Sequence, residues 1–271
     1  MSAHISPAWL QQHLGDPTVR IVETSIAKET YDAAHIPGAL WVDCHAELLR
    51  NGDESSGEVL TPEQYAALMR RLGVTPDMTV VWYGDRQSSF AIRGFWTMDY
   101  YRHAGVCYVL EGGRERWAAE GRPLTDAIEA VAATAYPVPT AVDRENRASL
   151  AMVRDAVTDP RKCILDVREL EEYEGTLVRA KHGGHIPGAA HVTWTAATAG
   201  DNVLKPEAEL RAMYEAQGVT PDKEVITHCQ LGIRAAHTWF VLKHVLGYPS
   251  VRNYDGSWQE WGNRDDTPIE E

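Results

Sequence analysis

Hydrophobic positions along the chain follow two alternating patterns. Short runs rich in β-branched and other apolar residues, such as residues 163–167, end at glycine or proline turns. Each turn is followed by a longer segment with the periodicity of an amphipathic helix. Strands that alternate with helices pair in parallel, because each helix carries the chain back to the start of the next strand. The pattern therefore predicts an α/β fold of parallel sheets flanked by helices.

The two halves of the chain repeat one another. Three segments recur in the same order in each half, and the second of them has the pattern of a helix followed by a strand. Each half therefore has the elements of its own parallel sheet. The matched segments are His35–Ala39 with His185–Ala189, residues 60–77 with 204–222, and residues 111–117 with 255–261.

The repeat predicts two tandem domains joined by a linker. Residues 125–141 separate the two sets of matched segments, and their Ala/Thr-rich run ends in Tyr136-Pro137-Val138-Pro139. Residues before proline avoid the helical region, so we expect this stretch to be partly extended. We predict a first domain over residues 1–124, a linker over 125–141 and a second domain over 142–271.

Composition narrows the choice of partners. The chain has 271 residues with 26 basic and 39 acidic side chains, a formal net charge of −13. This balance leaves no basic stripe for nucleic acid or for an anionic membrane surface, so we expect neither partner. No apolar run approaches the roughly 20 residues that span a bilayer, and the first residues lack a signal-peptide pattern. The expected location is the cytoplasm.

The spacings of the four cysteines do not fit a metal site, and a disulfide framework is not expected in so large a cytoplasmic chain, so we predict no metal and no disulfide. Cys107 and Cys163 lie in apolar strand runs and are predicted to be core residues. Cys44 follows a strand or turn with no predicted loop-to-helix setting, and no role is assigned to it. Cys229 differs from these three in its surroundings.

Cys229 is predicted to lie at the carboxyl end of a strand, directly before a loop and a helix that begins near Arg234. Parallel α/β sheets bind ligands at this edge, and loop amides with a helix dipole stabilise a thiolate there. Gly232 permits the tight loop. Arg234 can offer a planar fork of donors to an oxyanion, which gives an acidic protein a local anion site. A buried, inert thiol remains the alternative.

The matching loop of the first half lacks a nucleophile. Alignment of the repeats places Gly84 or Asp85 where the second half has Cys229, depending on a gap of one residue. Neither residue can accept sulfur. The first domain is therefore predicted to be a noncatalytic copy.

Together these segments resemble the tandem-domain rhodaneses, the thiosulfate sulfurtransferase family, in the bacterial type with one catalytic C-terminal domain. The resemblance covers nearly the whole chain. It implies two α/β domains, a persulfide on Cys229, and no metal or organic cofactor. It also implies that the loop residues Gln230, Leu231, Gly232, Ile233 and Arg234 bind the substrate anion. The residues that carry it are both His-Ile-Pro-Gly-Ala segments, Asp166–Glu169, Cys229–Arg234 and Gly256–Gly262.

The loop sequence bears on the sulfur donor. Mercaptopyruvate sulfurtransferases resemble Cys-Gly-Ser-Gly-Val-Thr in this loop and tend to carry an arginine at the position of Glu172. The loop found here, which ends in Arg234, is closer to thiosulfate enzymes. The expected small molecules are thiosulfate, sulfite and cyanide, with a thiol protein as a possible acceptor. Arg179 and Lys181 are candidate substrate-binding cations, although a solvated basic face explains them equally well.

Several alternatives stay open at this stage. The chain could be a 3-mercaptopyruvate sulfurtransferase, or a noncatalytic sulfur-carrier or anion-binding module. A cysteine phosphatase needs Cys-x5-Arg, and that register falls on Ala235 instead of Arg234. His228 and His237 are expected to have structural roles, while His35 and His185 are expected to brace turns. His35 keeps a small chance of a functional role in the mercaptopyruvate alternative.

Overall fold

The structure is a computed structural model that describes residues 3–25, 27–85, 88–199 and 203–271. The chain forms two compact units. The first contains Met1–Asp53, Val59–Asp143 and Thr198–Leu204, and the second contains Glu54–Glu58, Arg144–Ala197 and Lys205–Glu271. Each unit therefore includes a short segment from the other half of the chain, which the repeat pattern did not predict.

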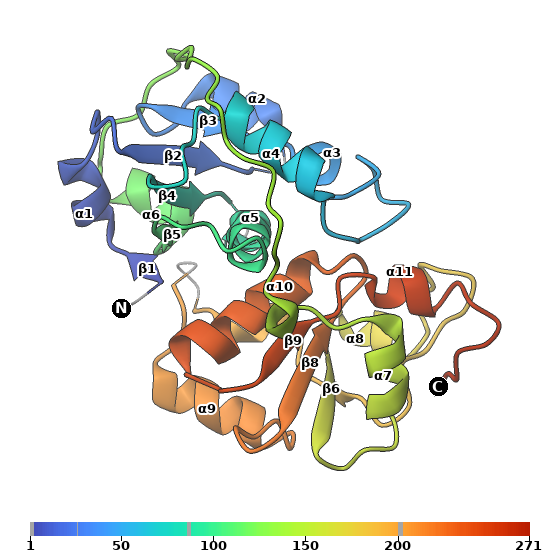
Figure 1. Ribbon diagram of the computed structural model, residues 1–271. Helices are drawn as coiled ribbons and strands as arrows, with labels where there is room; N and C mark the ends of the chain where they lie inside the picture. The colour runs from blue at the N-terminus through green and yellow to red at the C-terminus, as the bar shows by residue number, and fades with distance from the viewer. Residues whose placement is uncertain (1–2, 26, 86–87, 200–202) are drawn as a thin grey trace. The chain divides into compact units, whose positions relative to one another are not determined.

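The first unit is a parallel sheet with strand order β1-β5-β4-β2-β3 (Figure 1). Apolar side chains fill its core because the central strands are buried on both faces, as parallel strands are. Its strands are β1 (His4–Ile5), β2 (Val19–Glu23), β3 (Ala39–Trp41), β4 (Thr79–Tyr83) and β5 (Cys107–Leu110); its helices are α1 (Pro7–Gln12), α2 (Lys28–Ala33), α3 (Cys44–Leu48), α4 (Pro62–Arg71), α5 (Ser89–Tyr100) and α6 (Gly113–Ala119).

The second unit is a parallel sheet with strand order β7-β6-β8-β9. Figure 1 labels β6, β8 and β9 of this sheet. Side chains alternate across it: Ile226 faces the cluster formed with α7 and α11, while Thr227 donates its hydroxyl to a carbonyl of α10. Its strands are β6 (Lys162–Asp166), β7 (Ala190–His191), β8 (Glu224–His228) and β9 (Val251–Asn253); its helices are α7 (Leu150–Ala156), α8 (Leu170–Tyr173), α9 (Glu207–Glu215), α10 (Ile233–Phe240) and α11 (Ser257–Trp261), with shorter turns η2 (Arg144–Asn146), η3 (Trp194–Ala197) and a π-helical turn η4 (Val241–Val245).

Residues 125–141, predicted as a linker, pack within the first unit. All of them are described, and beyond an isolated bridge at Thr125 they form no helix or strand. Tyr136 is buried, its hydroxyl lies 3.2 Å from that of Tyr65, and its carbonyl accepts a hydrogen bond from Arg70. The segment is extended, but it is attached to the first unit and is not a free tether.

Glu54–Glu58, the segment of the first half that belongs to the second unit, packs closely within that unit. A Cβ atom at Gly57 would lie 2.2 Å from the carbonyl oxygen of Asp255 and 2.6 Å from that of Leu231. Only glycine permits this approach. The segment therefore supports the backbone that follows β8. Among the described residues, no helix is both long and apolar enough to cross a membrane.

Candidate functional site

Cys229 follows the last residue of β8 and precedes α10 in the second unit. Strand β8 lies between β6 and β9, so the thiol sits at the carboxyl end of a central parallel strand, the edge at which α/β sheets bind ligands. Its residue is buried, with 1% of its surface exposed. The loop of residues 229–234, here called the Cys229 loop, surrounds this position.

The backbone of the Cys229 loop presents unpaired amides. Within the described residues, the amides of Gln230, Leu231, Ile233 and Arg234 donate no hydrogen bond. The amides of Ile233 and Arg234 belong to the first turn of α10, which has no intrahelical partners for them, and those of Gln230 and Leu231 precede the N-cap. Unpaired backbone amides suit an anion. Gly232 is the N-cap of α10 with φ of +71°, a left-handed conformation that favours glycine. The side chains of Leu231 and Ile233 are buried, so these residues contribute through their backbone.

Two polar side chains and one backbone amide that the sequence did not single out hold this loop. The Ser257 hydroxyl accepts a hydrogen bond from the Cys229 amide at 3.0 Å, and the Asn253 amide donates to the Gly232 carbonyl at 3.0 Å. The backbone amide of Gln259 donates to the Gln230 carbonyl at 3.0 Å. Their only sequence signal was that Ser257 and Gln259 fall in the matched segment near the C-terminus. Each bond fixes the loop from β9 or α11.

Arg234 is engaged by a buried carboxylate. Its Nη1 and Nη2 atoms lie 2.6 and 3.0 Å from the two carboxylate oxygens of Glu172, whose side chain is 1% exposed. Burial alone would lower the pKa of Arg234, but the Glu172 bonds and the charge of a Cys229 thiolate raise it overall. Burial alone would raise the pKa of Glu172, yet the Arg234 bonds hold it below its ordinary value. The remaining N–H groups of Arg234 are those that a substrate anion could use.

The other predicted binding residues lie around this pair. The Gln230 side chain donates to the Arg179 carbonyl at 3.0 Å and to the Gln259 side chain at 3.1 Å, so it ties two loops together. Arg179 places Nη1 3.6 Å from Glu172. Lys181 forms an exposed ion pair with Asp265. Arg179 is therefore next to the Arg234 pair, whereas Lys181 is bound to a surface carboxylate.

A buried charged group lies behind the loop. Arg168 donates to both carboxylate oxygens of Asp166 at 2.6–3.0 Å and to the Gly184 carbonyl, and its guanidinium lies 4.4 Å from the Trp258 ring centroid. Both side chains are at most 1% exposed. His228 lies 3.5 Å from Asp166, and burial lowers its pKa to about 4, so it is neutral at pH 7. This group is structural in character, and it supports the end of β6 and β8.

Two further histidines brace turns in equivalent ways. His35 stacks on Tyr31 with centroids 3.9 Å apart, and its Nδ1 lies 2.8 Å from the Tyr31 carbonyl. His185 stacks on Tyr173 at 3.7 Å, with Nδ1 3.0 Å from the Tyr173 carbonyl. His237 is buried and packs edge-on against Trp194.

The other cysteines differ from Cys229 in their surroundings. Burial raises the pKa of Cys107 and Cys163, which lie on β5 and β6, so both thiols stay protonated at neutral pH. The expectation for Cys44 was wrong: it is the first residue of α3, directly after the N-cap Asp43. Burial nevertheless raises the pKa of Cys44 to about 12, and the Asp43 carboxylate opposes a second negative charge. A helix start alone therefore does not make a thiol reactive.

The structure resolves the alignment of the first-half loop. β4 ends at Tyr83, which pairs with the end of β2 as His228 pairs with the end of β6, so Gly84 matches Cys229. A Cβ atom at Gly84 would lie 2.4 Å from the Thr24 carbonyl oxygen. The position cannot hold a side chain without movement of the backbone that follows β2. The following residues 86 and 87 lie outside the described part of the chain.

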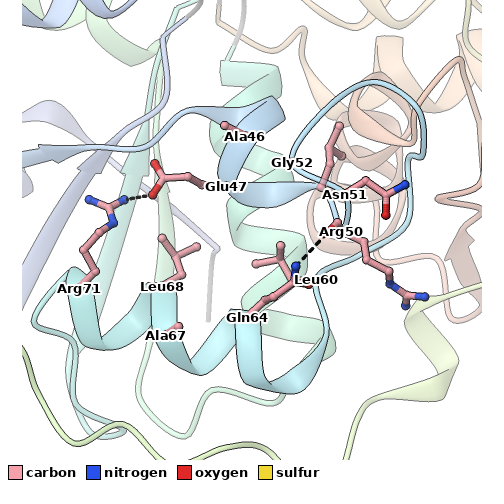
Figure 2. Close-up of a pocket in the computed structure, with 11 residues that line it drawn as sticks. Ala46, Glu47, Arg50, Asn51, Gly52, Leu60, Gln64, Ala67, Leu68 and Arg71 are labelled. Atoms are coloured by element: carbon pink, nitrogen blue, oxygen red, sulfur yellow. Dashed lines mark hydrogen bonds and ion pairs between the residues drawn. The ribbon is translucent and has the colours of Figure 1, made fainter.

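The first unit contains a pocket that does not involve the Cys229 loop. Figure 2 shows a pocket of about 360 Å³ between α3, the turn at residues 49–52 and α4. Leu60 and Leu68 line it, and Arg71 forms an ion pair with Glu47 at one end, 2.6 Å apart. It includes none of the predicted site residues. Among described residues, no group of three or more His, Cys, Asp or Glu side chains could hold a metal.

Comparison with known proteins identifies the repeat. The Rhodanese-like domain family matches residues 6–120 and again 149–264. The chain is 40% identical to the sulfur carrier protein TtuD of Thermus thermophilus over 98% of this chain and 95% of the relative. It is 37% identical to a thiosulfate sulfurtransferase of Corynebacterium glutamicum over 98% of this chain and 89% of the relative.

Solved structures show the same fold. The anaerobic ergothioneine biosynthesis enzyme of Chlorobium limicola, solved with trimethyl histidine, superposes with a TM-score of 0.85. The alignment covers 99% of this chain and 70% of that chain at 23% identity, so it bears on the fold alone. The predicted fold class is confirmed. The chain belongs to the rhodanese family, as a tandem of two Rhodanese-like domains.

Proposed function

We propose that the protein is a sulfurtransferase that takes the outer sulfur of thiosulfate onto Cys229 and passes it to cyanide or a thiol. The relatives named thiosulfate sulfurtransferase and sulfur carrier support sulfur transfer in general. The observation that carries the assignment to Cys229 is its position at the end of β8, at the start of a loop with four unpaired amides. We assign the chemistry to the second domain, because Gly84 occupies the matching position in the first.

The reaction divides into two displacements. The Cys229 thiolate attacks the outer sulfur of thiosulfate, the sulfur–sulfur bond breaks, and sulfite leaves with the bonding electron pair. An acceptor thiolate or cyanide then attacks the terminal sulfur of the Cys229 persulfide, and the Cys229 thiolate leaves. The loop amides, and the N–H groups of Arg234 that Glu172 does not use, stabilise the anionic groups as charge shifts. No proton transfer is required in either step.

A sulfur carrier is the second candidate, because the Thermus thermophilus relative is named as one. A carrier would accept sulfur on Cys229 and deliver it only to a protein. Turnover with cyanide separates the two, since cyanide is a small nucleophile that needs no protein partner. Glu172 stands at the position where mercaptopyruvate sulfurtransferases tend to carry an arginine, and its carboxylate is engaged by Arg234. The chain therefore offers no guanidinium at this position for the carboxylate of a 2-oxo acid, which favours thiosulfate as the donor.

Incubation with thiosulfate is expected to add one sulfur atom, about 32 Da, to the peptide that contains Cys229, with release of sulfite. Intact and peptide mass spectrometry would locate the added mass. Initial rates of thiocyanate formation with thiosulfate and with 3-mercaptopyruvate would then rank the donors. An unmodified Cys229 after exposure to both donors would refute sulfur transfer by this residue.

Gly232→Ala is expected to lower the free energy of unfolding by about 1–2 kcal/mol, because a Cβ atom is strained at φ of +71°. It should also raise the KM for thiosulfate, since relief of that strain turns the loop amides. Gly218→Ala is the matched control: its φ is +72°, the nearest atom to an added Cβ is 3.9 Å away, and it lies outside the Cys229 loop. Thermal unfolding and thiosulfate kinetics test both variants. An equal change of KM in the two would argue against the amide cradle.

A further inference from the structure

The second repeat carries an insertion that the first lacks. The stacked pairs Tyr31–His35 and Tyr173–His185 occupy equivalent places, and each tyrosine hydroxyl donates to the carbonyl of the matching alanine, Ala39 or Ala189. Three residues separate the first pair in sequence and eleven separate the second. The domain with Cys229 therefore has eight extra residues between the tyrosine and the histidine. Residues 174–184, which contain them, are here called the insertion.

The insertion is held by the close approach of its two ends and by hydrogen bonds of its backbone. A Cβ atom at Gly175 would lie 2.7 Å from the Gly184 amide nitrogen, so the two ends of the loop touch. The Leu177 amide donates to the Glu171 carbonyl at 2.8 Å, and the His182 amide donates to the Gly262 carbonyl at 3.0 Å. The Lys181 amide donates to the Asn263 side chain at 2.9 Å. This is a compact surface loop whose backbone is held at several points.

The insertion is also attached to the Cys229 loop. The Gln230 side chain, next to the nucleophile in sequence, donates to the Arg179 carbonyl at 3.0 Å. The Arg179 guanidinium approaches Glu172, which Arg234 also binds. Two guanidinium groups share this one carboxylate, so a positive charge remains beside the Cys229 loop. Any molecule that approaches the loop from this side meets the insertion.

The insertion exposes apolar side chains at this place. Leu177 and Val178 are 49% and 54% exposed, and Leu170 on the adjoining α8 is 49% exposed. These three are among the few large hydrophobic residues that the described chain leaves open to solvent. Cyanide and thiosulfate do not need apolar contacts. Exposed apolar side chains on a well-held backbone beside a reactive centre are typical of protein recognition.

We infer that Leu170, Leu177 and Val178 form a docking surface for a protein that accepts sulfur from Cys229. The inference rests on the proposed function. The partner's chemistry follows from the surface: a reactive thiolate flanked by apolar side chains, with the thiolate drawn to the positive charge of the Arg179–Glu172–Arg234 group. The partner thiolate attacks the terminal sulfur of the persulfide and Cys229 leaves as a thiolate. In a dithiol protein, the second thiolate then displaces hydrosulfide and closes a disulfide.

The test compares a protein acceptor with a small one. Reduced thioredoxin serves as the dithiol protein and cyanide as the small acceptor, each with thiosulfate as donor. In the double variant Leu177→Ser/Val178→Ser we expect the KM for thioredoxin to rise about 10-fold, while the KM and kcat for cyanide stay within about twofold. Leu124→Ser/Ile128→Ser, at exposed apolar residues of the first unit, is the matched control and should change neither reaction.

Each result has one meaning. Unchanged thioredoxin kinetics in the insertion variant would overturn the docking surface, as would an equal loss with both acceptors, which would make the insertion a support of the Cys229 loop. Wild-type protein that forms thiocyanate but releases no hydrosulfide with thioredoxin would overturn a dithiol protein as the occupant. Failure of wild-type protein with cyanide as well would count against the proposed function itself.

Discussion

Replacement of Cys229 by serine is expected to abolish sulfur transfer, with thiocyanate formation from thiosulfate and cyanide falling by about 10⁴-fold or more. A hydroxyl is a far weaker nucleophile toward sulfur than a thiolate, and it cannot carry a persulfide. The fold should persist, because serine and cysteine are nearly the same size and Cys229 makes its hydrogen bonds through its backbone. Circular dichroism and steady-state kinetics test both parts of this prediction.

Cys163→Ser is the matched control for this experiment. Cys163 lies on β6 of the same sheet, and burial raises the pKa of its thiol, so it should form no persulfide. We expect its kinetics to remain within about twofold of the wild type, since the residue has no part in nucleophilic catalysis. Activity retained in Cys229→Ser and lost in Cys163→Ser would refute the assignment of Cys229 as the nucleophile.

Replacement of Arg168 by methionine is expected to lower the free energy of unfolding of the second unit by about 3–5 kcal/mol. The change removes the guanidinium that binds both oxygens of the buried Asp166 carboxylate and leaves His228, 3.5 Å away, as its remaining titratable neighbour. The stacking of Arg168 on Trp258 is lost as well. Chemical denaturation followed by tryptophan fluorescence would measure the loss.

The free energy of unfolding of Arg168→Met is also expected to depend on pH differently from that of the wild type. Burial alone would raise the pKa of Asp166, but His228 and Arg168 hold it below its ordinary value. A lowered carboxyl pKa contributes stability that is present above pH 4 or so and is lost as the pH falls through the folded-state value. In Arg168→Met the share of this contribution that comes from Arg168 should be missing at neutral pH. The acid limb of its stability curve should therefore be shallower than in the wild type.

Two further variants test whether the buried charge of Asp166 causes the loss of stability in Arg168→Met. Asp166→Asn combined with Arg168→Met removes both charges and should recover part of the lost stability, because no unpaired charge stays buried. Lys181→Ala breaks only an exposed ion pair with Asp265 and should leave the unfolding transition unchanged. A full loss of stability in the double variant would mean that packing, and not the buried charge, dominates at this position.

Local sequence pattern predicted the architecture well. The alternation of apolar strands with amphipathic helices predicted parallel sheets, and the family comparison confirms that fold. Backbone conformation follows neighbouring residues, so short-range periodicity carries this information. The structure likewise has Cys229 at a strand end directly before a helix, as its flanking residues indicated. Its catalytic role stays a proposal until the persulfide is measured.

Local sequence pattern did not predict features that depend on contacts between residues distant in sequence, nor a helix too short to show periodicity. Cys44 was assigned no helix start because α3 is only five residues long, too short for periodicity to reveal. The segment 125–141 was predicted as a linker because proline and small residues dominate it. Its attachment to the first unit depends on Tyr136 meeting Tyr65, seventy-one positions away.

The sequence alone determined that the chain is a duplicated α/β protein and that Cys229 lies between a strand and a helix. Only the tertiary structure decided what surrounds that thiol. Arg234 meets Glu172 across sixty-two positions of sequence, and Cys229 meets Ser257 across twenty-eight. Such pairs form because the carboxyl ends of parallel strands converge at one edge of the sheet. Their partners are set by strand order and by packing, and neither is written in the spacing of residues along the chain.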